Sequence, residues 1–312
     1  MTTGRLLYLG YHAPLAALAR SVREGGPIHQ WRNRRGEQAM RVAAAWLTPT
    51  APLDPALPRG PDLCFLTGKK YWHQTAFCAW SLVRAAGRPL PFVFHDDGTI
   101  DQEFINEAHR LFPDSKIITA AVADAVLDAH LPAARFPALR AQRRTYLHLR
   151  KLTDCHAGRP GPRLVLDSDM LFFRRPDALL AWLDTPVDPI HMVDVQDSYG
   201  YPAATLQTLA TGPLPSCVNV GVLGLRSETI DWEKLEHACA TLLAQHGTSY
   251  FLEQALSALL LSAENPTRLP AADYRVLPDA SECVSPTAAL HHYVAESKRG
   301  YFRHGWRHVF PA

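Results

Sequence analysis

The chain has 312 residues, of which 47% are hydrophobic, and its formal net charge at pH 7 is +2. This length and composition suit one large α/β domain, or one domain with an extension, and allow a substantial core. Because the net charge is close to zero, the overall charge gives no reason to expect nucleic acid or an anionic membrane as a partner.

Targeting signals and cysteine usage narrow the class of protein further. No stretch approaches the roughly 20 apolar residues of a membrane-spanning helix, and the first residues lack the basic and apolar regions of a signal peptide. The six cysteines are scattered, with no C-x-x-C pair, which is typical of reduced thiols. We therefore expect a cytoplasmic protein that does not insert into membranes.

Residues 1–60 are predicted to form a helical N-terminal extension. An Ala-rich stretch at 13–23 predicts a helix, and a basic patch follows at 31–35. The segment 49–61 contains five prolines, which cannot continue a helix or a central strand and so indicate a boundary. The main domain is expected at 61–312.

Strand and helix patterns alternate through that main domain. The expected strands are 63–67, 91–95, 116–119, 163–166, 189–193 and 217–225. The expected helices are 72–86, 102–111, 138–155, 176–183, 228–245 and 249–261. This alternation predicts an α/β fold with a mainly parallel sheet flanked by helices. Ligands bind such sheets beyond the carboxyl ends of the strands.

The apolar run that begins at Arg163 stops at two carboxylates one residue apart, Asp167 and Asp169, and then resumes. Ionised carboxylates at the end of a buried strand are costly unless they face a cleft, a cation or a partner. Mg²⁺ and Mn²⁺ prefer carboxylate oxygens and are commonly completed by substrate phosphates. The motif therefore predicts a site for a metal and a diphosphate, although aspartates that merely cap a turn would leave the same pattern.

The order of short motifs along the chain resembles that of the GT-A glycosyltransferases. These motifs are Thr67-Gly68, Asp96-Asp97, Asp167-x-Asp169, Asn219-x-Gly221, Glu253-Gln254 and His292. The similarity covers roughly residues 62–306 and is closest to the glycogenin-like, retaining enzymes. It implies a Rossmann-like GT-A domain with a donor half at about 61–170 and an acceptor half at about 171–312. It also implies transfer of a hexose from a nucleoside diphosphate sugar, preferably a UDP-sugar, to an unknown sugar, glycan or other small acceptor.

The resemblance assigns the metal site. In the family, the two aspartates of the motif hold the Mn²⁺ or Mg²⁺ that bridges the diphosphate, so Asp167 and Asp169 become metal ligands. A late histidine is the third ligand, and a lysine six residues later reaches the diphosphate; His292 and Lys298 have this spacing. The family's Pro-Trp after the lysine is missing, and an ordinary, partly exposed histidine is the alternative for His292.

The resemblance also suggests residues for the nucleotide. Thr67 and Gly68 match the position that holds the base, and Asp96 and Asp97 match one that accepts hydrogen bonds from base or ribose. A simple turn at either place is the alternative. The remaining donor-site candidates, by position, are Ser168 between the two aspartates and Arg150 and Lys151 of the helix before them. A solvated basic face is the alternative for that helix, with Arg140 and Arg144 expected in water.

Asn219, Glu253 and Gln254 are the candidate catalytic residues on the acceptor side. In a retaining reaction, the donor phosphate itself can deprotonate the acceptor, whereas an inverting reaction needs a carboxylate as general base, for which Glu253 is the candidate. The sequence leaves the stereochemical outcome open. The loop 194–202, with two tyrosines and two aspartates, has a composition suited to a sugar acceptor.

Three other functions use the same features. A haloacid-dehalogenase-type, Mg²⁺-dependent phosphatase also places Asp-x-Asp after an apolar strand, although it usually does so near the start of its domain. A nucleotidyltransferase would need a Gly-rich phosphate loop, which is missing after the first strand. A non-catalytic binding module would use the basic segments 32–35 and 140–151 as its surface. A zinc site at His304 and His308 is less favoured than solvated histidines.

Overall fold

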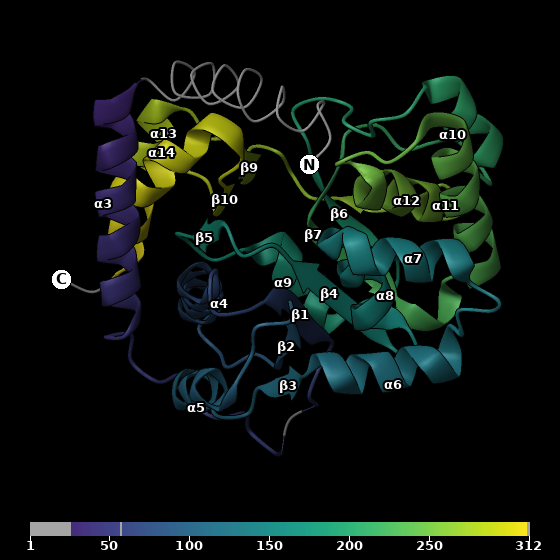
Figure 1. Cartoon of the computed structure of the whole chain (residues 1–312). Coiled ribbons are helices and arrows are strands. Elements are labelled where there is room, and N and C mark those ends of the chain that lie inside the picture. The colour runs from purple at the N-terminus through teal and green to yellow at the C-terminus, as the bar shows by residue number, and fades with distance from the viewer. Residues whose placement is uncertain (1–25, 57, 311–312) are drawn as a thin grey trace, which may run out of the picture.

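The computed structural model describes residues 26–56 and 58–310 and shows an α/β fold built on a sheet of seven strands (Figure 1). The order across this sheet is β3-β2-β1-β4-β7-β6-β8. Its strands are β1 (Asp62–Thr67), β2 (Phe92–Asp96), β3 (Lys116–Ile118), β4 (Pro162–Leu166), β6 (Ile190–Val193), β7 (Val218–Arg226) and β8 (Thr267–Arg268). The expected mainly parallel sheet is confirmed.

One strand departs from the parallel arrangement and determines where the site lies. β1 pairs in parallel with both β2 and β4, and β6 pairs in parallel with β8. β7 instead runs antiparallel to β4, with Leu166 opposite Val222, and the amide of Asp167 donates to the carbonyl of Gly221 at 2.9 Å. The beginning of β7 therefore lies beside the carboxyl end of β4.

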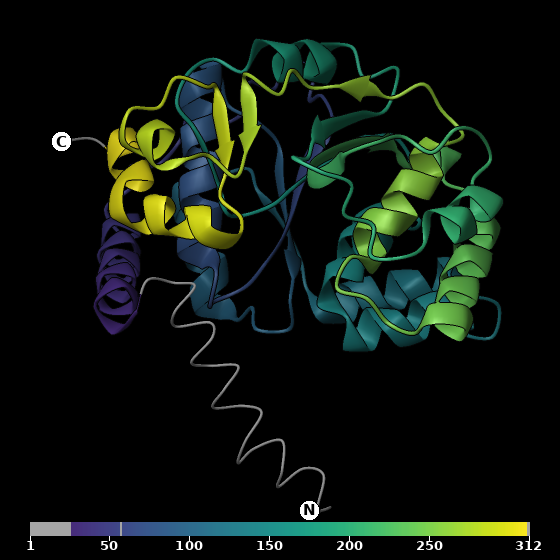
Figure 2. The ribbon, with the colours of Figure 1, turned by 90° about the horizontal axis from the view of Figure 1, so that it is seen from above.

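Helices cover both faces of the sheet (Figures 1 and 2). In chain order they are α4 (Trp72–Ala86), α5 (Gln102–Leu111), α6 (Ala120–His130), α7 (Pro137–Thr145), α8 (Arg150–His156), α9 (Asp177–Asp184), α10 (Ala203–Leu209), α11 (Trp232–His246), α12 (Leu252–Leu261) and α13 (Ala280–Val284). α5 and α11 begin at Asp101 and Asp231, whose carboxylates accept the amide of a first-turn residue, as N-cap aspartates do. Among the described residues, no helix is both long and apolar enough to cross a membrane.

The segment expected as a single helix at 138–155 is broken, and that prediction was wrong. α7 ends before Tyr146, whose backbone is extended, and α8 begins at Arg150 after a short 3₁₀ turn. The break folds α8 back on α7, so that the guanidinium of Arg143 donates to both carboxylate oxygens of Asp154 at 2.6 and 2.7 Å. A fork-to-fork pair of this kind needs the two helices side by side.

Part of the expected extension packs into the main core. α3 (Pro27–Ala44) lies beside the C-terminal segment that includes α14 (Lys298–Gly300) and α15 (Trp306–Val309) (Figures 1 and 2). Met40 and Leu47 are almost fully buried in the same apolar cluster as the large sheet. Gly36 permits this contact, since a Cβ there would lie 2.3 Å from the carbonyl oxygen of Phe302. The helix expected at 13–23 lies outside the described residues.

A second, three-stranded sheet carries the late part of the chain back to the two aspartates. Its order is β5-β10-β9, with β5 (Met170–Phe172), β9 (Tyr274–Val276) and β10 (Leu290–His292). β10 is antiparallel to β5, and His292 pairs with Met170. Because Met170 follows Asp169 directly, this register places residue 292 beside the carboxylate motif.

Candidate active site

Two carboxylates and one imidazole converge where the two sheets meet. Ligand atoms of Asp167, Asp169 and His292 all lie within 4.8 Å of one another. His292 Nε2 is 3.5 Å from Asp167 Oδ2 and 3.3 Å from Asp169 Oδ1. Carboxylate oxygen and imidazole nitrogen are ligand types that Mn²⁺ and related ions accept. The sequence predicted this grouping, and the structure brings all three residues together.

Asn219 fixes the orientation and the tautomer of His292. Asn219 Oδ1 accepts the amide of Gly221 at 2.9 Å, while its Nδ2 donates to Asp194 at 3.0 Å. The oxygen that lies 3.1 Å from His292 Nδ1 is therefore an acceptor, so Nδ1 must carry the proton and donate it. Nε2 is left facing the two aspartates, which is the arrangement by which a neighbour orients a metal-binding histidine.

Gly221 is required by the close approach of β10. A Cβ at this position would lie 2.5 Å from two ring atoms of His292 and 2.8 Å from Asn219 Oδ1. Any larger residue would displace the imidazole, because carbon atoms do not approach so closely in a packed interior. The Asn219-x-Gly221 motif thus supplies both the hydrogen-bond acceptor and the space that His292 needs.

Lys151 is a buried cation between two acids. Its Nζ lies 2.8 Å from Asp167 Oδ1 and 3.1 Å from Glu253 Oε2, and its side chain is only 5% exposed. Burial acts to lower the pKa of Lys151, but Asp167 and Glu253 outweigh it and raise the pKa. Burial raises the pKa of Glu253 to about 7 even though Lys151 opposes the shift. The structure thus keeps a carboxyl group that titrates near neutral pH beside the metal-type site.

Asp169 is held ionised by its neighbours. Burial favours the neutral acid, but His292 and Lys298 overcome it and hold the pKa of Asp169 below its ordinary value. Lys298 Nζ lies 3.0 Å from Asp169 Oδ2 and its side chain is 45% exposed, so the ammonium group also faces solvent. A flexible ammonium group of this kind can interact with an anionic ligand.

A cavity of about 540 Å³ opens directly in front of these groups. Six of the predicted site residues line it: Lys151, Asp167, Asn219, Glu253, Gln254 and His292. The cavity has the size and the few convergent polar groups of a small-molecule site. Gln254 is oriented by its amide, which donates to the carbonyl of Val218 at 2.8 Å and to Asp194 at 3.3 Å.

The end of β1 is joined to the motif by a chain of hydroxyl groups. Thr67 Oγ1 lies 2.6 Å from Thr75 Oγ1, which lies 2.8 Å from Ser168 Oγ. Gly68 lets the loop after β2 approach, since a Cβ there would lie 2.0 Å from Asp97 Oδ1. None of these predicted donor-site residues lines the 540 Å³ cavity.

Asp96 acts locally as a loop cap. Its Oδ1 accepts the amides of residues 98–100 at 2.7–3.0 Å, and its Oδ2 accepts the amide of Ala120. Its carbonyl accepts a hydrogen bond from Arg150 at 3.1 Å. Arg150 lines a separate cavity of about 340 Å³ with Arg140, Arg143 and Arg144. Arg150 therefore lines a different cavity from the one beside the metal-type cluster.

The basic helix is largely neutralised within the fold. Arg140, expected in water, is buried and pairs with Asp128 at 2.6 Å, so that expectation was wrong. Arg143 pairs with Asp124 as well as with Asp154. Arg143 meets Asp154 because α8 folds back on α7, and Arg140 meets Asp128 of the preceding helix, α6. A free basic surface does not run along this segment.

Several cavity residues escaped sequence reasoning. Tyr146, His148 and Tyr250 line the 540 Å³ cavity, and the hydroxyl of Tyr146 donates to the carbonyl of Tyr250. Tyr146 and His148 could have been noticed in the sequence, because their rings interrupt the otherwise basic segment that was predicted as one helix. Asp194 belongs to the predicted loop 194–202 and lines the cavity, but its role was not predicted: its carboxylate orients Asn219 and Gln254.

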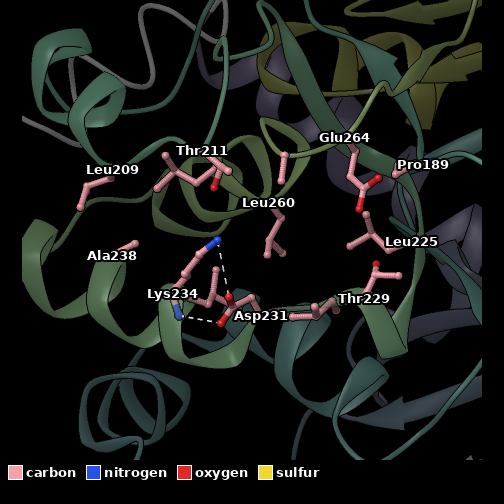
Figure 3. A pocket seen from close by; sticks show the side chains of 14 residues that line it. Pro189, Leu209, Thr211, Leu225, Thr229, Asp231, Lys234, Ala238, Leu260 and Glu264 are labelled. Atoms are coloured by element: carbon pink, nitrogen blue, oxygen red, sulfur yellow. Dashed lines mark hydrogen bonds and ion pairs between the residues drawn. The ribbon is translucent and has the colours of Figure 1, made fainter.

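A second hollow, shown in Figure 3, has no comparable chemistry. It measures about 70 Å³ and lies against β7, α11 and α12. Two of its three charged residues are occupied with each other, since Asp231 caps α11 and pairs with the Lys234 ammonium at 3.6 Å, and the third is Glu264. His304 and His308 are exposed and belong to neither metal-type cluster found among the described residues.

The fold is similar to several solved glycosyltransferase structures. Mouse xyloside xylosyltransferase 1 in its apo form has a TM-score of 0.48 at 14% identity, over 75% of this chain and 97% of that one. The galactosyltransferase LgtC, in complex with donor and acceptor sugar analogues, has a TM-score of 0.49 at 16% identity, over 75% and 87%. Core-mannan synthase A from Aspergillus fumigatus, in its Mn/GDP form, has a TM-score of 0.47 at 11% identity, over 83% and 92%.

No protein-family model matches the sequence, and no curated protein matches it. At this level of similarity the neighbours do not define the chemistry of this chain. Its function has to be inferred from its own side chains.

Proposed function

We propose that this protein is a metal-dependent GT-A glycosyltransferase, nearest to the glycogenin-like enzymes, that transfers a hexose from a UDP-sugar to a small acceptor. The observation that carries the proposal is the convergence of Asp167, Asp169 and His292 within 4.8 Å, beside a cavity of about 540 Å³. Two carboxylates and an imidazole hold a divalent ion incompletely, which leaves positions for substrate phosphate oxygens.

The residues fit Mn²⁺ or Mg²⁺. His292 directs Nε2 toward the aspartates because Nδ1 donates a hydrogen bond to Asn219 Oδ1, and the two aspartates supply the hard oxygen ligands. When bound, the ion neutralises charge that develops on the departing nucleoside diphosphate. Lys298, half exposed beside Asp169, is placed to bind the diphosphate directly.

Lys151 and Glu253 line the same cavity beside Asp167. Lys151 balances the charge of Asp167 and Glu253 together, which keeps a carboxylate close to the expected sugar position. In an inverting reaction Glu253 would be the general base, and its pKa of about 7 suits proton transfer near neutral pH. In a retaining reaction the donor phosphate takes the acceptor proton, and Gln254 and Glu253 stabilise the positive charge on the sugar.

The remaining assignments extend this proposal to the nucleoside. The carboxyl ends of β1 and β2 lie at one edge of the sheet, where ligands of such folds bind. Thr67 and Gly68 would face the base and Asp97 the ribose, while Ser168 would stay as the hydroxyl link behind the aspartates. Residues 61–170 would then form the donor half and residues 171–312 the acceptor half.

A phosphatase of the haloacid-dehalogenase type is less favoured. In that family the Asp-x-Asp motif usually lies near the start of the domain, whereas here it follows β4, the fourth strand in the described part of the chain. A basic binding module is less favoured because Arg140 and Arg143 are buried in ion pairs.

The test is thermal unfolding in the presence of UDP, GDP, CDP or ADP, each with Mn²⁺ or with EDTA. A ligand that binds the folded state raises the unfolding temperature by mass action. We expect a Mn²⁺-dependent increase with UDP that is lost in Asp167→Ala/Asp169→Ala. The control is Asp177→Ala/Asp184→Ala, which removes two exposed carboxylates and should leave the shift intact. No shift with any nucleotide would refute the donor site.

A further inference from the structure

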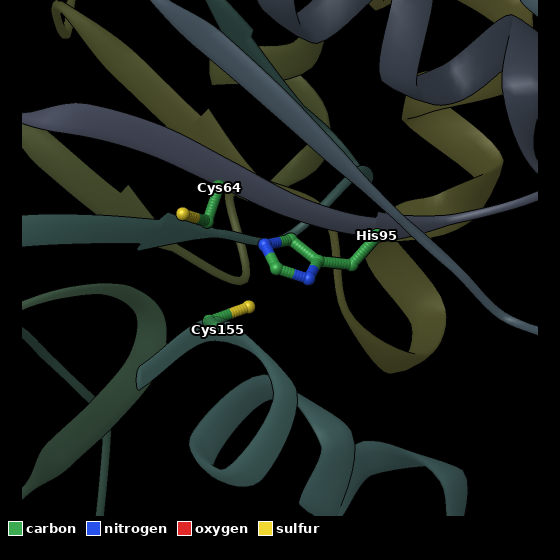
Figure 4. A group of neighbouring side chains, drawn as sticks. All are labelled: Cys64, His95 and Cys155. Carbon is green, nitrogen blue, oxygen red and sulfur yellow. The ribbon is translucent and has the colours of Figure 1, made fainter. Parts of the chain in front are cut away.

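A second group of potential metal-ligating side chains lies between the large sheet and α8, separate from the carboxylate site. Cys64 comes from β1, His95 from β2 and Cys155 from α8 (Figure 4). One ligand atom of each lies within 4.8 Å of those of the other two. The two cysteines are fully buried, and His95 is 1% exposed. Residues distant in sequence are thus brought to one point by three elements.

The imidazole of His95 has no hydrogen-bond partner for either ring nitrogen among the residues that the structure describes. A buried polar nitrogen without a partner costs about 1–3 kcal/mol, and almost all such atoms in folded proteins are satisfied. Val93 and Val165 complete this small cluster with the two cysteines, whose thiols are only weak donors and acceptors. Something other than the chain itself is therefore expected to satisfy His95.

The surroundings favour the thiolate at Cys64, whereas burial and the neighbouring Cys64 raise the pKa of the Cys155 thiol. A hydrogen bond with Cys155 lowers the pKa of the Cys64 thiol, and His95 and the Arg163 guanidinium lower it further, although burial opposes them. Arg163 Nη1 lies 3.9 Å from Cys64 Sγ and is itself paired with Asp62 at 3.0 Å. The thiolate is the form of cysteine that binds metals.

We propose that Cys64, His95 and Cys155 bind one thiophilic d¹⁰ metal ion, Zn²⁺ or Cu⁺, in the interior of the protein. Two sulfur ligands and one imidazole form a soft donor set that selects these ions over Mn²⁺ and Mg²⁺. Binding forms two metal–sulfur bonds and one metal–nitrogen bond, and any thiol proton still present, as on Cys155, is released to solvent. No oxidation or reduction is involved.

The two ions differ in how well they fit. With two thiolates, Zn²⁺ leaves the group electrically neutral, whereas Cu⁺ leaves one buried negative charge. Three ligands, however, complete the coordination of Cu⁺ and leave one position open on Zn²⁺, which prefers four. Charge and ligand number thus point to different ions, and the experiment distinguishes them.

The position of the group predicts its effect on the rest of the molecule. Cys155 lies one helical turn after Lys151 on α8, and His95 directly precedes Asp96 at the end of β2. A bound ion would join β1, β2 and α8 covalently, and it would stabilise the frame that carries Lys151. Its own chemistry would stay remote from the substrate cavity, since none of its three ligands lines that cavity.

The first measurement is an anaerobic titration of the metal-free protein with Co²⁺, read as thiolate-to-cobalt charge-transfer absorption. We expect one equivalent of absorbing cobalt, which one equivalent of the preferred ion, Zn²⁺ or Cu⁺, displaces while the other ion requires an excess. The absorption should be lost in Cys64→Ala and in Cys155→Ala. It should persist in Cys239→Ala, a matched buried cysteine of α11, and in Asp167→Ala/Asp169→Ala, because oxygen ligands give no such band.

A second measurement needs no substitution and so does not depend on whether a variant folds. The six cysteines, none of which forms a disulfide, are alkylated slowly with and without one equivalent of Zn²⁺ or Cu⁺, and each site is quantified by mass spectrometry. We expect selective protection of Cys64 and Cys155 by the preferred ion, at least tenfold. Equal alkylation in both conditions, or a Cys64–Cys155 disulfide formed without metal protection, would overturn the proposal.

Discussion

Asn219→Ala should weaken metal binding without removing a metal ligand. The substitution deletes the oxygen that accepts from His292 Nδ1 at 3.1 Å and from the Gly221 amide at 2.9 Å. Without this acceptor the imidazole can rotate or change tautomer, so Nε2 no longer faces Asp167 and Asp169. Loss of a partner that orients a ligand typically costs about 10–100-fold in metal affinity, or roughly 1.4–2.8 kcal/mol.

The assay is calorimetric titration of the nucleotide-free protein with MnCl₂, supported by electron paramagnetic resonance of the free ion. Ser227→Ala is the matched control, because Ser227 Oγ bonds Nδ1 of another buried histidine, His156, at 2.9 Å. It should cost similar folding stability, about 1–3 kcal/mol, but leave the Mn²⁺ affinity unchanged. Wild-type affinity in a folded Asn219→Ala protein, or equal weakening in both variants, would refute the orientation argument.

Two further predictions concern buried charges. Because the pKa of Glu253 rises from 4.5 in the unfolded chain to about 7 in the fold, stability present below pH 4.5 is lost as the pH rises to about 7. The difference corresponds to at most about 3 kcal/mol of folding stability. In urea unfolding with EDTA, the free energy of unfolding should therefore fall more steeply with rising pH for the wild type than for Glu253→Gln, and equal pH dependence of the two proteins would contradict this prediction. Arg143→Ala leaves Asp154 buried without its bidentate partner and should cost about 3–5 kcal/mol. Arg144→Ala, at an exposed position, should stay within about 0.5 kcal/mol in the same unfolding assay.

The hydrophobic pattern of the sequence was sufficient to predict the strands of the large sheet. The apolar runs at 63–67 and 217–225 are continuous because both faces of those strands are covered, and continuous runs are typical of central strands. The basic segment 138–155 misled because helical spacing is preserved across its break. The break at Tyr146 is imposed by tertiary contacts, the Arg143–Asp154 pair and the hydroxyl of Tyr146 on Tyr250, which local propensity does not contain.

Polarity patterns at strand ends located the aspartates but not the roles of their neighbours. Two carboxylates at the end of an apolar strand indicate a binding site by themselves, so Asp167 and Asp169 were identified from the sequence. Asn219 was expected to be a catalytic residue on the acceptor side, whereas its amide oxygen and nitrogen are occupied by His292, Gly221 and Asp194. Whether a polar side chain faces a ligand or another side chain depends on which strand lies opposite, and this is a property of sheet topology.

The position of His292 shows how much depends on register. His291 and His292 are adjacent and alternate across β10, so a shift of one residue against β5 would exchange them. In the observed register His291 points to the other side, where its Nε2 lies 2.8 Å from Glu282 and its Nδ1 3.0 Å from the hydroxyl of Tyr293. Glu282 in turn accepts three backbone and side-chain donors from residues 287–288. His291 thereby holds β10 from the face opposite His292. The position of His292 in the metal-type cluster therefore depends on the buried pair of His291 and Glu282.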